Sequence, residues 1–105
     1  MEIVRENLEV TYMGNKLSPE MMELVFIATF ERVDKHTAVM GELALLDEEV
    51  NPVIDGLRQG GLDVSALHNH MIGEKPRILY VHFQGMGDVS QLAQTIKGAI
   101  EKTTL

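Results

Sequence analysis

Three of the four histidines in the chain, together with a glutamate, lie within residues 68–82: His68, His70, Glu74 and His82. His68 and His70 are two residues apart in a segment with strand character, so both imidazoles project from the same face of a strand. Neutral imidazoles held side by side are natural ligands for a transition metal, and a carboxylate can complete the set. The spacing therefore predicts a site for a divalent transition metal (Zn²⁺, Mn²⁺ or Fe²⁺).

The register of the expected hairpin decides whether His82 joins the other two histidines. A turn centred on Glu74 places His68 opposite Tyr80 and puts all three histidines on one face. A turn centred one half-step earlier pairs His68 with Leu79 and moves His82 to the other face. Packing favours the first register, because alternate apolar residues of the second strand then face the helices.

The same histidines also have a structural interpretation. Two histidines separated by one residue are weak evidence for metal binding, and histidines on a half-buried sheet often only hydrogen-bond to their neighbours. Two alternatives therefore stand: a metal or catalytic site, and a structural polar cluster. The fourth histidine, His36, is expected in a turn as an exposed residue.

Glu42 and Arg77 are the candidate catalytic residues. Glu42 interrupts an apolar segment, and its even position separates it from Val39 and Leu43. Its carboxylate is therefore expected on the histidine face, as a metal ligand or general base. The alternative is a charge that protects an edge strand from aggregation. Arg77 is the nearest cation that could hold a substrate carboxylate or phosphate.

Two helices are predicted from apolar spacing and end signals. The first has Asp47 as its N-cap and stops at Gly60-Gly61. Its apolar stripe is Val50, Val53, Ile54 and Leu57. The second begins at Asp88, with Gln91 completing a capping box, and runs to about Lys102.

The rest of the chain has strand character. The predicted strands are residues 7–13, 23–33, 37–46, 62–71 and 77–84. The order of three strands, a helix, two strands and a helix predicts one α+β domain over residues 1–105. We expect a mainly antiparallel sheet of about five strands with both helices packed on one face.

Composition limits the partners. The chain has 9 Lys and Arg against 16 Asp and Glu, a net charge of −7, which disfavours nucleic acid and anionic membranes. The absence of cysteine excludes disulfides and thiolate metal sites. The first residues lack the pattern of a signal peptide, and no apolar run could span a bilayer, so a cytoplasmic protein is expected.

Four segments closely resemble the LppY/LpqO-type domain, a bacterial family of unknown function. They are MGELALL (40–46), EVNPVI (49–54), ALHNHM (66–71) and PRILYVHF (76–83). The likeness covers residues 7–103, and the family supplies no established reaction. The positions that match its motif are Asn51, His68, His70, Pro76, Arg77 and His82.

The resemblance also implies an assembly. Members of that family are often exported and built from two similar copies, so a single-copy chain is expected to form a homodimer. The expected contact is the half-apolar second face of the sheet, with Ala38, Met40, Ile78 and Tyr80.

Two functions follow as hypotheses. The first is a metal-binding small-molecule domain or metal-dependent enzyme, with an open coordination position for water or a carboxylate or carbonyl substrate. The second is a non-catalytic homodimeric binding or sensing module, in which the histidines form a structural or interface cluster. Whether the chain is an enzyme stays open at this point.

Overall fold

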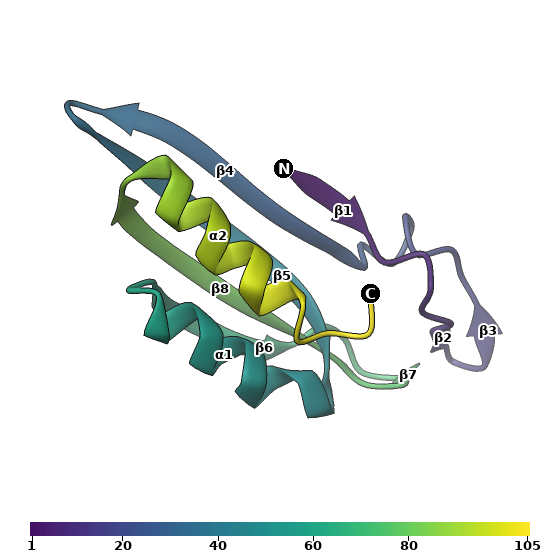
Figure 1. Cartoon of the computed structure of the whole chain (residues 1–105). Helices are drawn as coiled ribbons and strands as arrows, with labels where there is room; N and C mark the ends of the chain where they lie inside the picture. Colours follow the sequence, from purple (N-terminus) through teal and green to yellow (C-terminus); the bar gives the residue numbers. More distant parts are fainter.

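A five-stranded antiparallel sheet forms the centre of the computed structural model, which describes residues 1–105 (Figure 1). In spatial order its strands are β1 (Glu2–Val4), β4 (Val25–Val33), β5 (His36–Leu46), β8 (Ile78–Gly87) and β6 (Asp63–Asn69). A smaller sheet contains β3 (Asn15–Lys16), β2 (Thr11–Tyr12) and β7 (Glu74–Lys75). The helices are α1 (Val50–Gln59), preceded by a 3₁₀ turn (Asp47–Glu49), and α2 (Val89–Ile100). The predicted α+β class is confirmed.

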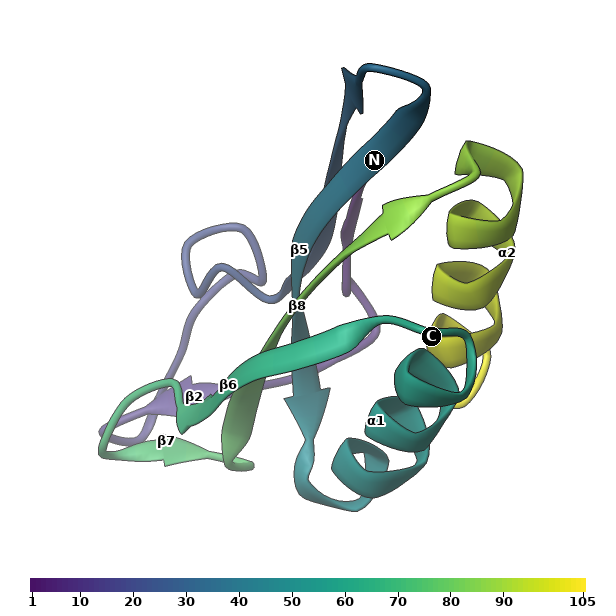
Figure 2. The same ribbon diagram turned by 90° about the vertical axis from the view of Figure 1, so that its left-hand side faces the viewer.

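Both helices cover one face of the large sheet, while the small sheet lies on the other side (Figure 2). On the helix face, Phe26, Leu43 and Phe83 are almost fully buried against Leu57 of α1 and Ile96 of α2. Burial of this apolar surface is the main source of stability for the layer. Neither helix has the length and apolar composition needed to cross a membrane.

The helix ends agree in part with the expected signals. The side chain of Asp88 accepts a hydrogen bond from the Gln91 backbone N–H (3.2 Å), as an N-cap does. Gly61 follows α1 with φ of +88°, a conformation that suits glycine. The expectation for Asp47 was wrong: it opens the 3₁₀ turn instead of capping α1. Helix α2 also stops at Ile100, before the expected end.

The N-terminal region differs most from the prediction. Only Thr11–Tyr12 of the strand expected at 7–13 is strand, because Val10 packs into a second core instead of joining a continuous ladder. Met13 and Gly14 both have positive φ, 53° and 85°, and turn the chain tightly into β3. The sequence also gave no sign of β1, which is three residues long and therefore too short to show periodicity.

Residues 8–24 cover part of the sheet face opposite the helices, where β5 ends and β8 begins. The resulting second core contains Val10, Met22, Leu24, Ala44, Ile78 and Tyr80. Ile78 and Tyr80, expected at a dimer contact, are therefore buried within the chain at 0% and 6% exposure. Beyond this core the face is open, with Met40 68% exposed.

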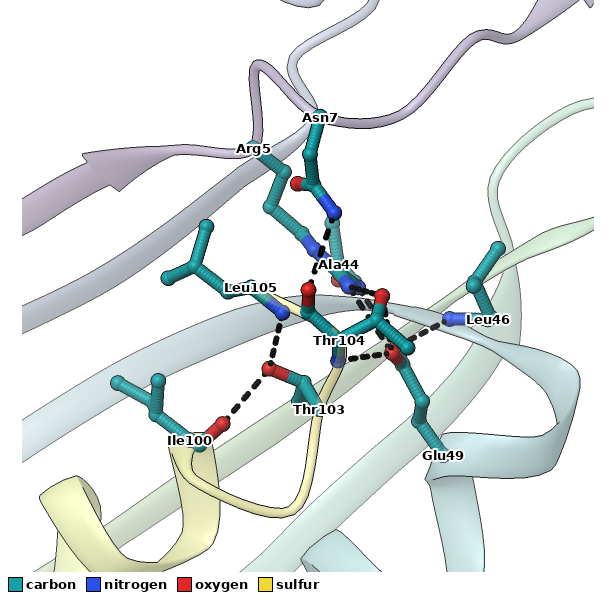
Figure 3. A network of polar contacts seen from close by, with 9 residues as sticks. All are labelled: Arg5, Asn7, Ala44, Leu46, Glu49, Ile100, Thr103, Thr104 and Leu105. Atoms are coloured by element: carbon teal, nitrogen blue, oxygen red, sulfur yellow. Dashed lines mark hydrogen bonds and ion pairs between the residues drawn. The ribbon is translucent and has the colours of Figure 1, made fainter.

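A buried ion pair joins the two ends of the chain to the start of α1 (Figure 3). The Arg5 guanidinium donates to both carboxylate oxygens of Glu49, at 2.6 and 2.9 Å, and to the Ala44 carbonyl at 3.0 Å. It also lies over the Phe26 ring, 5.0 Å from its centroid. Both side chains are almost completely buried, and Glu49 accepts further bonds from the backbone N–H and the hydroxyl of Thr104.

The pKa of the Glu49 carboxyl reflects two opposed effects. Burial by itself raises this pKa, because the charged form loses its hydration. Hydrogen bonds from Arg5, from the Leu46 N–H and from Thr104, together with the positive charge of Arg5, outweigh burial and hold the pKa below its ordinary value. Glu49 is therefore ionised in the folded chain.

We expect Glu49→Gln to lower the free energy of unfolding by about 3–5 kcal/mol, because it leaves the buried Arg5 charge without its partner. Chemical denaturation of both proteins measures the difference. Glu9→Gln is the matched control, because it removes an exposed pair with Lys16 and should cost less than about 1 kcal/mol. Equal effects of the two substitutions would contradict the role of the buried pair.

Acid should reveal the same pair. The unfolded chain binds a proton at Glu49 near the ordinary pKa of 4.5, whereas the folded chain does so only at lower pH. The stabilisation is therefore complete above 4.5 and is lost as the pH falls through the lower folded pKa. Denaturation at several pH values should show a shallower acid dependence in Glu49→Gln than in the native chain.

Candidate functional site

The β6–β8 pairing adopts the register in which the histidines share a face. His68 lies opposite Tyr80 and Ala66 opposite His82, as the favoured register predicted. A bulge between Val64 and Ala66 shifts the first residues of β6 without changing this part of the ladder. The connection is longer than a simple hairpin turn, because β7 within it pairs with β2.

His68, His82 and Glu42 come together on the open part of the second face. The Nε2 atoms of His68 and His82 are 2.9 Å apart, and the rings stack at 5.0 Å between centroids. Glu42 lies directly opposite His82 in the β5–β8 ladder, and its Oε2 atom is 3.4 Å from His82 Nε2. The side chains of Glu42 and His82 are about one-third exposed, so small molecules and ions can reach them.

The position of Glu42 excludes one of its two explanations. Strand β5 is central, between β4 and β8, so Glu42 does not protect a sheet edge. Its carboxylate instead points to the same face as His82, as the strand alternation predicted.

A backbone contact orients the His68 ring. His68 Nδ1 is 3.1 Å from the Asn69 carbonyl oxygen, which can only accept, so Nδ1 carries the proton. In the neutral imidazole Nε2 then has a free lone pair, and it accepts a hydrogen bond from the Nε2–H of His82. A backbone carbonyl that fixes the tautomer in this way is also the usual support of a metal-ligating histidine.

His70 and Glu74 form a separate pair. His70 Nδ1 lies 2.9 Å from Glu74 Oε2, and the other carboxylate oxygen accepts a bond from the Ile78 N–H at 3.3 Å. The Glu74 side chain is only 1% exposed. Both of its oxygens are thus engaged within the fold, and the arrangement makes Glu74 an orienting partner of His70.

Tyr80 lies against both groups. Its ring is 4.9 Å from the His70 ring and 5.8 Å from the His68 ring, and its hydroxyl donates to the Glu23 carbonyl at 2.5 Å. Burial raises the pKa of the Tyr80 hydroxyl above its ordinary value, and the charges of Glu23, Glu42 and Glu74 raise it further. The hydroxyl therefore stays protonated and anchors the loop before β4.

The structure separates the predicted residues. Of the four predicted ligands, His68 and His82 are in contact, while His70 and Glu74 form the second pair. In the arrangement that the structure shows, no three or more histidine, aspartate and glutamate side chains are already placed around a position for a metal ion. Arg77 is exposed just before β8 and binds Asp47 at 2.8 Å. His36 is exposed as expected, although it begins β5 instead of lying in the turn.

A hollow of about 400 Å³ borders Glu42. Its lining residues are Glu2, Val4, Pro19, Glu20, Glu23, Val25, Ile27 and Glu42. A second hollow, of about 320 Å³, shares Ile27 and Glu42 and reaches His82. The lining comes from three distant segments, so no local sequence signal could have identified it.

The tautomers can be checked directly. At about pH 8, where free imidazole is neutral, His68 should carry its proton on Nδ1 and His82 on Nε2. Long-range ¹H–¹⁵N correlation spectra distinguish the two forms, and the exposed His36 serves as the reference. A His68 ring protonated on Nε2 would contradict the orientation described above.

Comparison with known proteins gives a family without an assigned activity. No curated protein and no solved structure matches the chain significantly. One family, described as a Domain of Unknown Function (DUF1259), matches residues 1–102. The match covers both sheets, both helices and all four histidines. The chain therefore belongs to the DUF1259 family of uncharacterised domains.

Proposed function

We propose that this domain binds one divalent transition metal (Zn²⁺, Mn²⁺ or Fe²⁺) through His68, His82 and Glu42, and takes a small molecule beside it. The observation that carries the proposal is the convergence of two imidazole Nε2 atoms 2.9 Å apart with a carboxylate oxygen 3.4 Å from one of them. Two histidines and one carboxylate are a common ligand set for such metals.

Two separations lie near the values of such a set, although the three side chains are not yet placed to hold an ion and would have to move on binding. Ligands about 2.0–2.1 Å from a metal in tetrahedral geometry are roughly 3.4 Å from one another. The Glu42–His82 separation already has this value. The His68–His82 separation is shorter because His82 Nε2–H donates a hydrogen bond to His68 Nε2. Metal binding would require that proton to leave and the rings to part slightly.

The surroundings support a small-molecule ligand. Three protein ligands leave coordination free, and the hollows beside Glu42 and His82 offer space for a molecule next to the metal. A metal at this position would polarise a bound carbonyl or carboxylate. Arg77, which is paired with Asp47, is not among the residues that line these hollows.

The residue assignments differ from the four-ligand set expected from spacing. Glu42 replaces Glu74, whose oxygens are engaged by His70 and the Ile78 N–H. His70 is paired with Glu74 and packs against the Tyr80 ring. Of the positions that match the LppY/LpqO-type domain, His68 and His82 take part in this proposal. That family supplies no reaction to add to it.

The alternative is a binding module whose histidines are structural. It is favoured by the hydrogen bond between His68 and His82, which gives the Nε2 atom of each ring a partner without a metal. Metal analysis separates the two functions.

Elemental analysis of untagged protein purified without chelator should find close to one equivalent of Zn, Mn or Fe per chain. The His82→Asn variant should bind no metal, because His82 is the ligand that contacts both His68 and Glu42. The His36→Asn variant should keep its metal, because His36 is exposed and distant in the chain from these residues. Circular dichroism should show that both variants remain folded.

Other outcomes assign the site differently. Loss of metal in Glu74→Gln or His70→Asn as well as in His82→Asn would favour the larger ligand set expected from the sequence. No metal in the native protein, and none taken up on titration, would leave the histidines as a structural cluster.

A further inference from the structure

An apolar surface lies at the end of the molecule that carries the small sheet. Four large side chains are exposed there: Ile72 (95%), Met21 (73%), Met13 (69%) and Tyr12 (40%). We call this group the apolar end. Met13 and Ile72 are held close by the bond from the Met13 N–H to the Gly73 carbonyl, 2.9 Å. The Ile72 side chain is thus almost entirely in water, although nothing in its turn requires an apolar residue.

A hollow of about 520 Å³ lies within the apolar end. All of its lining residues are apolar: Tyr12, Leu17, Met21, Met22, Met71 and Ile72. Methionine side chains are flexible and adapt their shape to an apolar partner. An exposed apolar side chain therefore stands directly at the rim of an apolar hollow.

We propose that the apolar end is the interface between two copies of this chain. A projection beside a hollow is self-complementary: a twofold axis through the rim carries Ile72 of each copy into the hollow of the other. A closed pair results, and neither copy keeps a free apolar end.

The area fits this occupant. With roughly 200 Å² for a fully exposed large residue, the four residues together present about 550 Å² of surface per copy. Monomeric proteins rarely expose a contiguous apolar patch larger than a few hundred Å². A standard interface buries about 800 Å² per partner, so this patch would supply about two-thirds of such an interface and the residues around it the rest.

No charged side chain lines the hollow, so the contact itself buries no charge. The contact is independent of the histidine face, since it shares no residue with His68, His82 or Glu42. It also replaces the contact expected from the sequence, in which Ile78 and Tyr80 took part.

Sedimentation velocity over a range of concentrations tests the interface in the full chain. The native chain should dimerise, and Ile72→Gln should raise the dissociation constant by roughly 100-fold or more, because each dimer loses two buried isoleucines. Met40→Gln is the matched control: Met40 is 68% exposed on the open sheet face and should leave the constant unchanged. Melting curves confirm that both variants fold.

Three results would overturn the proposal. They are a native chain that stays monomeric at millimolar concentration, an Ile72→Gln variant that dimerises as well as the native chain, and a dimer that Met40→Gln disrupts. Binding of a monomeric chain to phosphatidylcholine vesicles, lost in Ile72→Gln, would identify a lipid surface as the occupant instead. None of these results depends on whether the histidine face binds metal.

Discussion

The pairing of β5 with β8 is the constraint on which the rest of the structure depends. It runs from Thr37 opposite Gly87 to Leu46 opposite Ile78, and β4 and β6 add to its two sides. Because side chains alternate along a strand, this one register decides which residues reach each face. It places Leu43 and Val81 under the helices and Glu42 beside His82 on the opposite face.

The Arg5–Glu49 pair connects the segment after β1 and the C-terminal segment to the residues before α1, which the β5–β8 pairing does not do. Glu49 ends the 3₁₀ turn directly before α1, Arg5 follows β1, and Thr104 brings the C-terminal segment to the same carboxylate. Burying two charges is costly, so such a pair is favourable only when hydrogen bonds satisfy both partners. Here the Ala44 carbonyl and the Leu46 N–H supply most of those bonds, and only Arg5 Nε is buried without a hydrogen-bond partner. The short N-terminal strand is thereby fixed against β4 although it buries little apolar surface itself.

The second sheet face serves two purposes in different places. One part is a core covered by residues 8–24, in which Ile78 and Tyr80 are buried. The part next to it remains open and carries polar groups that contact one another: Glu42, His82 and His68. Buried polar groups normally have hydrogen-bond partners within the fold. Partly exposed groups such as Glu42 and His82 can in addition contact a ligand. The boundary between the two parts runs along Tyr80, which touches His68 on one side and His70 on the other.

Local patterns in the sequence determined the α+β class, the main strands and the two helices, and the packing of alternate apolar residues favoured the register that brings His68 and His82 to one face. These follow from periodicity and capping, which act over a few residues. The tertiary structure alone decided that Glu42 meets His82 and that Arg5 contacts Glu49, 44 residues away. It likewise decided that Ile78 and Tyr80 are covered by the N-terminal region. Such contacts join segments distant in the chain, and a period of two or 3.6 residues contains no information about which distant segment covers a given face.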